Sequence, residues 1–208
     1  MAEFVLKART AFAGLAVPGR YGAAIAGDHP VIIAERPNMR VTQLSVFHGK
    51  REALAGIVRD IAGAELPEGP KRSAAGGLSL IGTAPTQWLA IAEDGQGRET
   101  LARLHEAVSG LAAVVDQSDA KAMLRLSGPR IRDVLAKGCS LDLHARAFTP
   151  QDAATTQVAL IPCQLWMRDE VPTFEVAVPL SYARSFWAWL TESAAEFGYE
   201  VKPALNGK

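Results

Sequence analysis

Hydrophobic and polar positions in the first half of the chain follow two different periods. Residues 39–47 alternate as a strand does, whereas residues 50–63 place apolar side chains at i, i+3, i+4 and i+7, the spacing of an amphipathic helix. Further elements are predicted as strands at 78–82 and 87–92, a helix at 98–109 and a strand at 113–116. The order is therefore strand-helix-strand-strand-helix-strand.

The second half shows the same general order. Residues 123–127 alternate as a strand, Gly128-Pro129 opens a short helix and Gly138 ends it. The remaining predicted elements are strands at 156–161, 164–168 and 173–178, a helix at 181–198, and a last strand ending at Val201. The pattern predicts one compact α+β domain built of two tandem ferredoxin-like units with antiparallel sheets, residues 39–120 and 121–208.

Residues 1–38 have neither period. They are rich in glycine and proline, yet apolar side chains occur throughout the segment. A structureless stretch of this length is uncommon inside a compact domain. We therefore predict an extended N-terminal arm, buried either by this domain or, as the preferred interpretation, by a partner chain. Its candidate partner-interface residues are Phe4, Leu15 and Tyr21.

The last predicted helix has one aromatic residue off its apolar stripe. Phe186, Leu190 and Phe197 belong to the stripe, and Trp187 points about 110° away from its centre by the helical period. An aromatic side chain at such a position is a candidate partner contact. The alternative, equally favoured, is a tryptophan lying flat over its neighbours.

Composition narrows the class of protein. The 22 basic and 22 acidic residues cancel, which argues against a nucleic-acid-binding protein. No apolar run approaches the roughly 20 residues that a membrane span requires. Cys139 and Cys163 lack a metal-ligand spacing and are expected to be buried thiols in a reducing compartment. Because Glu3 does not suit a secretory signal, we predict a cytoplasmic protein.

Candidate chemical motifs are few. Residues 95–100 resemble the start of a dinucleotide-binding fingerprint, but the third glycine is replaced and Glu93-Asp94 would repel a pyrophosphate, so a strand-ending turn is favoured. The four histidines have no metal-ligand spacing, and there is no Gly-x-Ser-x-Gly elbow. Residues 121–137 carry five basic side chains against one acidic, which favours a solvated helix face over an anion site. We predict no catalytic, cofactor-binding or metal-binding residue.

Several stretches carry a family resemblance. They are residues 116–129 (DQSDAKAMLRLSGP), 134–138 (VLAKG), 141–144 (LDLH), 166–174 (WMRDEVPTF), 185–190 (SFWAWL) and 87–92 (QWLAIA), together with Pro179. Through them the chain resembles the gamma subunit of heterotetrameric sarcosine oxidase over roughly residues 38 to 201. The strand-Ser-Gly-Pro-helix pattern is shared with the related folate-binding domain of aminomethyltransferases.

The resemblance implies a part in the oxidative demethylation of sarcosine to glycine, with hydrogen peroxide formed and the methyl carbon passed to tetrahydrofolate. It also implies a non-catalytic chain that binds no cofactor itself, in a complex whose alpha, beta and delta subunits are its partners. The FAD, FMN, NAD and tetrahydrofolate would be held by other subunits. Two alternatives stay open: a stand-alone folate-dependent aminomethyltransferase-like protein, and an interaction module unrelated to one-carbon chemistry.

Overall fold

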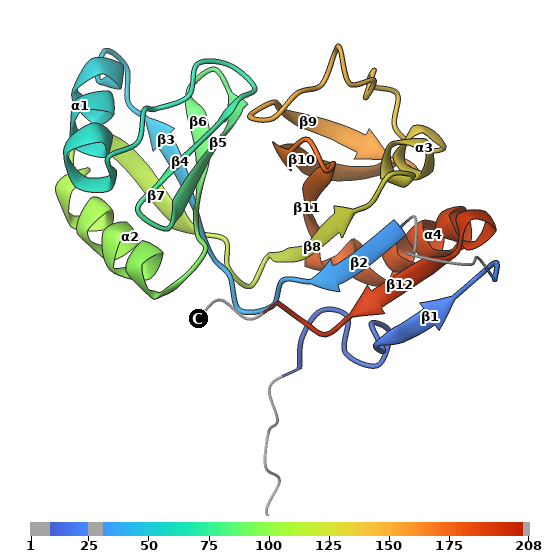
Figure 1. The fold of residues 1–208 in the computed structure, drawn as a ribbon. Helices are drawn as coiled ribbons and strands as arrows, with labels where there is room; N and C mark the ends of the chain where they lie inside the picture. The colour runs from blue at the N-terminus through green and yellow to red at the C-terminus, as the bar shows by residue number, and fades with distance from the viewer. Residues whose placement is uncertain (1–8, 25–30, 206–208) are drawn as a thin grey trace, which may run out of the picture.

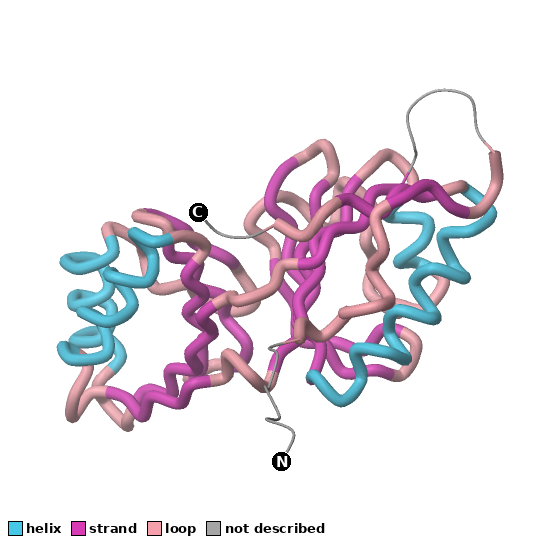
Figure 2. Tube along the Cα trace, turned by 90° about the horizontal axis from the view of Figure 1, so that it is seen from below, coloured by secondary structure: helices cyan, strands magenta, loops and turns pink. Residues whose placement is uncertain are grey.

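Two β-sheets face each other, and each carries its helices on its outer side (Figures 1 and 2). A computed structural model describes residues 9–24 and 31–205. In Figure 2 the helices lie at the two ends of the molecule and the strands lie between them. None of the helices in these two ranges is long and apolar enough to cross a membrane.

The smaller sheet has five strands in the order β4-β5-β6-β3-β7. Its elements are β3 (Arg40–Val46), α1 (Arg51–Ala62), β4 (Arg72–Ala75), β5 (Leu78–Ala84), β6 (Gln87–Ala92), α2 (Gly95–Ala107) and β7 (Ala112–Asp116). Leu54 and Val58 of α1 and Leu104 of α2 are fully buried in one cluster with Leu44 and Leu80 of the sheet. The apolar stripes that predicted the two helices are thus the faces that cover this sheet.

The larger sheet has seven strands in the order β1-β12-β2-β8-β11-β10-β9. Its strands are β1 (Gly19–Tyr21), β2 (Val31–Glu35), β8 (Lys121–Ser127), β9 (Ala153–Val158), β10 (Ile161–Asp169), β11 (Thr173–Pro179) and β12 (Tyr199–Lys202). Its helical elements are α3 (Ile131–Ala136), η1 (Leu180–Tyr182), α4 (Ala183–Ala194) and η2 (Ala195–Phe197). Leu135 of α3 and Phe186 and Leu190 of α4 are fully buried in the core of this half.

The mixed α and β architecture with two sheets agrees with the prediction, but the tandem ferredoxin-like arrangement is not confirmed. Strand β2 comes from the segment expected to be an arm, and it lies between β12 and β8. It runs parallel to β12 and antiparallel to β8, so the larger sheet is not wholly antiparallel. Val31 and Ile33 are fully buried, which gives the segment a reason to join the sheet rather than extend from it.

The described part of residues 1–38 is therefore packed into the domain. Besides β2, β1 pairs with β12 at the sheet edge, and Phe12 is 1% exposed. The Phe12 ring lies 5.6 Å from that of Trp187, centroid to centroid. The preferred prediction, burial of this segment by a partner chain, does not hold for Phe12 and β2, because helix α4 of the chain itself packs on Phe12 and the larger sheet takes in β2.

A third apolar cluster joins the two sheets. It contains Val41 and Ile91 of the smaller sheet and Met39, which directly precedes β3. From the larger sheet it contains Met123 and Trp166. All five side chains are nearly inaccessible to solvent. The inner faces of the sheets are thus held together by burial of apolar surface, and the polar groups beside this cluster are fixed relative to both sheets.

Candidate functional site

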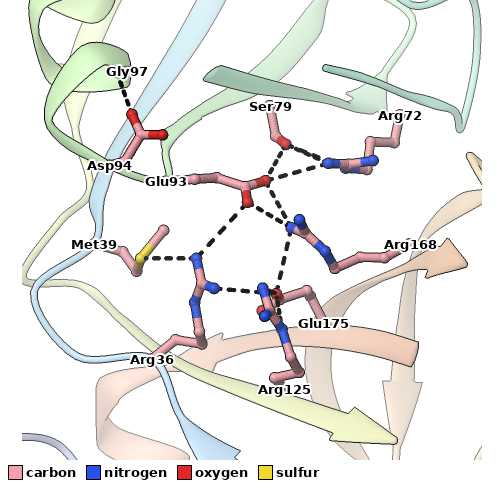
Figure 3. Close-up of polar contacts among 10 residues, drawn as sticks. All are labelled: Arg36, Met39, Arg72, Ser79, Glu93, Asp94, Gly97, Arg125, Arg168 and Glu175. Atoms are coloured by element: carbon pink, nitrogen blue, oxygen red, sulfur yellow. Dashed lines mark hydrogen bonds and ion pairs between the residues drawn. The ribbon is translucent and has the colours of Figure 1, made fainter. Parts of the chain in front are cut away.

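Charged side chains from both sheets meet beside the inter-sheet cluster (Figure 3). We call the following six residues the Arg–Glu cluster: Arg36, Arg72, Glu93, Arg125, Arg168 and Glu175. Arg72 lies on β4 and Glu93 directly follows β6, so these two belong to the smaller sheet. The other four come from the larger sheet, Arg36 from the residue after β2.

Glu93 is held by groups from both sheets. Arg168 Nη1 lies 2.8 and 2.7 Å from its two carboxylate oxygens, Arg72 Nη2 lies 3.3 Å from one of them, and the Ser79 hydroxyl donates to the same oxygen. Burial alone would raise the pKa of Glu93. The hydrogen bond from Ser79 and the charge of Arg168 outweigh burial and lower the pKa to about 2.

Glu175 is the buried carboxylate of the larger sheet, with 1% exposure. Arg125, its cross-strand neighbour on β8, donates from Nε and Nη2 to Glu175 Oε1 at 2.8 and 2.6 Å. Arg168 and Arg36 lie 3.6 and 3.8 Å from the same oxygen. Because Arg168 contacts both carboxylates, it links the ion pairs of the two sheets.

The Arg–Glu cluster holds four arginines against two glutamates, so it carries an excess of positive charge. Burial lowers the pKa of Arg36, and the nearby Glu175 partly opposes that effect. A carboxyl group with a pKa near 2 stays ionised at neutral pH and is poorly matched to general acid or base work there. The cluster is thus a network of ion pairs that connects the two sheets, and we call this role an electrostatic joint between the sheets.

The depressed pKa of Glu93 predicts acid sensitivity. A carboxylate with a lowered folded-state pKa contributes stability above its unfolded value of 4.5, and that stability is lost as pH falls towards about 2. We expect a loss of about 3 kcal/mol from this group, since each tenfold difference in proton affinity between the folded and unfolded chain corresponds to about 1.4 kcal/mol. Thermal unfolding measured from pH 6 to pH 2 should show a steep fall in Tm for the wild type and a shallower one for Glu93→Gln. Parallel curves would contradict this assignment.

A cavity of about 490 Å³ lies next to the cluster and shares Arg36 with it. Its wall is formed by residues 9–11, by the connection from β2 to β3, and by residues 118–123, which include the start of β8. We call this cavity the basic cleft, because its charged lining residues are five basic and two acidic: Arg9, Arg36, Arg40, Arg98, Lys121, Glu35 and Asp119. Unlike the Arg–Glu cluster, it is a concave surface with which the chain could recognise another molecule.

The four residues predicted to contact a partner differ in how far the structure exposes them. Phe4 lies outside the described residues. Leu15 is partly buried against the larger core, and Trp187 is only 8% exposed because the N-terminal segment covers it. Its off-stripe position is thus explained within the chain. Tyr21 remains 38% exposed, stacks on Tyr199 and donates its hydroxyl hydrogen to the Val17 carbonyl.

The glycine-containing motif at residues 95–100 has a structural explanation. Asp94 is the N-cap of α2 and accepts a hydrogen bond from the Gly97 amide at 2.7 Å, as Figure 3 shows. A Cβ at Gly97 would lie 2.1 Å from the Gly77 carbonyl oxygen, so close packing requires glycine there. The motif therefore forms the capped N-terminus of α2, which packs closely against the connection between β4 and β5.

The basic residues of 121–137 do not form one patch. Lys121 donates to Gln164 and Arg125 to Glu175, whereas Arg132 donates to the Leu143 and Phe148 carbonyls. Arg130 and Lys137 pair with Asp133 and Glu196. Over residues 9–24 and 31–205, no three His, Cys, Asp or Glu side chains gather closely enough to hold a metal ion.

Sequence reasoning missed the Arg–Glu cluster, although one signal was available. Glu175 lies on β11. The other residues of this strand from 173 to 178 are all buried, and all of them except Thr173 are apolar. A charged residue at such a position needs a partner of opposite charge. Which arginines supply it depends on the neighbours of β11, and that strand order was not predicted.

Known proteins match most of the chain. The model of the "Sarcosine oxidase, gamma subunit family" matches residues 49–196. Sarcosine oxidase subunit gamma of an Arthrobacter species is 35% identical over 138 residues, which are 65% of this chain and 66% of that protein. The counterpart from Corynebacterium sp. (strain U-96) is 28% identical over 181 residues, 84% of each chain.

Solved structures agree with these relatives. A chain of the heterotetrameric sarcosine oxidase from Corynebacterium sp. U-96, in complex with pyrrole 2-carboxylate, superposes with a TM-score of 0.76 at 27% identity, covering 91% of this chain and 96% of that one. The glycine cleavage system aminomethyltransferase T from Bartonella henselae shares the fold, with a TM-score of 0.60 at 16% identity over 85% of this chain and 48% of that one. The resemblance drawn from the sequence is confirmed, and the chain belongs to the sarcosine oxidase gamma subunit family.

Proposed function

We propose that this chain is the non-catalytic gamma subunit of a heterotetrameric sarcosine oxidase. The observation that carries the proposal is the superposition on a chain of such an enzyme over 91% of this chain and 96% of that one. The complex would oxidise the N-methyl group of sarcosine, release glycine and pass the methyl carbon to tetrahydrofolate. The two hydrogens removed would reduce O2 to hydrogen peroxide, which balances the reaction.

In this proposal the chain contributes structure and recognition. The Arg–Glu cluster keeps Glu93 ionised between arginines, which suits an ion-pair link between the two sheets better than proton transfer. FAD, FMN, NAD and tetrahydrofolate would be bound by the other subunits, named alpha, beta and delta. A cytoplasmic location fits the two free, buried cysteines, since a reducing compartment keeps thiols unpaired.

Affinity purification of the tagged chain from its own cells tests the proposal. We expect a yellow complex of this chain with larger subunits that consumes oxygen when sarcosine is added, because flavins absorb visible light. Recovery of a colourless, uncomplexed chain that binds tetrahydrofolate by itself would overturn the proposal in favour of a stand-alone aminomethyltransferase-like protein. A complex that is yellow but inactive on sarcosine would reject the substrate.

A further inference from the structure

Positive charge is concentrated at one place on a chain whose net charge is zero. The basic cleft and the Arg–Glu cluster share Arg36, and together they hold eight basic and four acidic side chains. Charges of one sign that line a concave surface reinforce one another and attract groups of the opposite sign. The cleft therefore has the electrostatic character of a surface that receives carboxylates.

The lining residues leave much of this charge unneutralised. Arg98 donates to the Asn38 carbonyl at 3.1 Å and Lys121 to the Gln164 side chain at 3.0 Å, both neutral acceptors. The side chains of Arg9 and Arg40 form no hydrogen bond or ion pair with a described residue, although Arg40, after the hydrogen bonds from Ser118, helps to lower the pKa of Asp116. These cations are therefore available to an incoming group.

Glu35, one of the two acids in the lining, is already engaged. Its carboxylate accepts hydrogen bonds from the Thr10 hydroxyl at 2.9 Å and the Phe12 amide at 3.2 Å. These bonds hold residues 10–12 against β2, while the carboxylate keeps its negative charge. The lining thus holds two carboxylates, Glu35 and Asp119, against five cations, of which Arg36 is already paired with Glu175.

The rim of the basic cleft is apolar on one side. Leu180, a lining residue, is 45% exposed, and Tyr182 on the same short helix is 44% exposed. Protein interfaces combine arginine and aromatic residues around an apolar centre with a polar rim. A basic hollow with the exposed apolar side chain of Leu180 in its wall thus matches a protein segment in which carboxylates flank an apolar residue.

We propose that the basic cleft is a docking site for an acidic segment of a larger partner subunit, with carboxylates contacting Arg40 and Arg98 and an apolar side chain resting on Leu180. This inference rests on the proposed function, because it identifies the surface through which the subunit assembles. Charge complementarity selects the occupant, and the mobility of exposed arginine side chains lets them adapt to it.

Assembly of charge-reversal variants tests the site. The double variant Arg40→Glu/Arg98→Glu is expected to bind the purified larger subunits at least tenfold more weakly than the wild type. Wild-type binding should also weaken between 50 and 500 mM NaCl more than that of the variant, because salt screens exposed charges. The control Arg103→Glu/Arg146→Glu makes the same change of charge at exposed positions outside the cleft, Arg103 on the same helix as Arg98, and should assemble normally.

Zero-length cross-linking tests the chemistry of the partner. Arg40→Lys keeps the positive charge and adds a primary amine, which a carbodiimide couples to a nearby carboxylate with loss of water. We expect a new amide between Lys introduced at this position and an Asp or Glu of a larger subunit, absent from Arg103→Lys and from the wild type. Equal cross-linking of the two lysine variants would overturn the proposal.

The outcomes also separate the inference from the function on which it rests. If the wild type and both double variants assemble equally well, the docking site is wrong while the subunit function stands. Tight binding of citrate to the cleft with unchanged assembly of Arg40→Glu/Arg98→Glu would likewise overturn it, in favour of a small organic anion. If the wild type does not bind the larger subunits, the proposed function itself fails.

Discussion

Replacement of Glu175 by glutamine is expected to lower the free energy of unfolding by about 3–5 kcal/mol, the cost of removing one partner from a buried ion pair. Glu175 is 1% exposed and receives two hydrogen bonds from Arg125, with Arg36 and Arg168 within 4 Å. Without its charge these three cations would face one another next to the single carboxylate of Glu93. Urea denaturation of the full-length chain, followed by circular dichroism, measures the loss.

Glu196→Gln is the matched control for this prediction. Glu196 pairs with Lys137, but its side chain is 59% exposed, and such surface pairs contribute about 0–1 kcal/mol. Its substitution should therefore leave the unfolding midpoint almost unchanged. A Glu175→Gln variant as stable as Glu196→Gln would show that solvent, rather than the two glutamates, compensates the arginines, and the Arg–Glu cluster would no longer be a joint between the sheets.

Sequence patterns predicted most of the regular elements of residues 40–202, because the apolar periodicity that marks a helix or strand depends only on residues close together in the sequence. The apolar stripe of residues 50–63 corresponds to α1 (Arg51–Ala62), and residues 87–92 form β6 as predicted. Strand β2 (VIIAE) contains the β-branched residues 31–33 but was missed, because its segment as a whole has no regular period and Pro30 and Pro37 flank the run. Its place in the sheet is fixed by partners far away in sequence, β8 and β12, which no local period encodes.

The candidate site depended on the same long-range information. Residues 121–137 stood out in the sequence as a basic stretch, yet only Arg125 joins the Arg–Glu cluster. Arg36 and Arg168 lie on two other segments of the larger sheet, and Arg72 of the smaller sheet joins them because the two sheets face each other. The family resemblance needed none of this geometry, since it rested on contiguous motifs that the family model also covers.

The N-terminal segment provides the second large expected effect. Phe12→Ala should lower the free energy of unfolding by about 3–5 kcal/mol, because truncation of a buried phenylalanine loses transfer free energy and leaves a cavity. Phe12 is 1% exposed and packs on Trp187, so the variant should also show a red-shifted tryptophan emission in the folded state. Urea denaturation and fluorescence of the full-length chain measure both effects.

Leu160→Ala controls for the loss of a large apolar side chain without loss of packing. Leu160 is 87% exposed at the turn between β9 and β10, so its truncation should change stability by no more than about 0.5 kcal/mol. The pair of variants decides between the two roles that the sequence pattern allowed for residues 1–38. If Phe12→Ala keeps wild-type stability but weakens assembly with the larger subunits, the segment serves a partner chain. If it loses stability as expected, Phe12 belongs to the domain core, and its segment holds Arg9 in the wall of the basic cleft from a folded position.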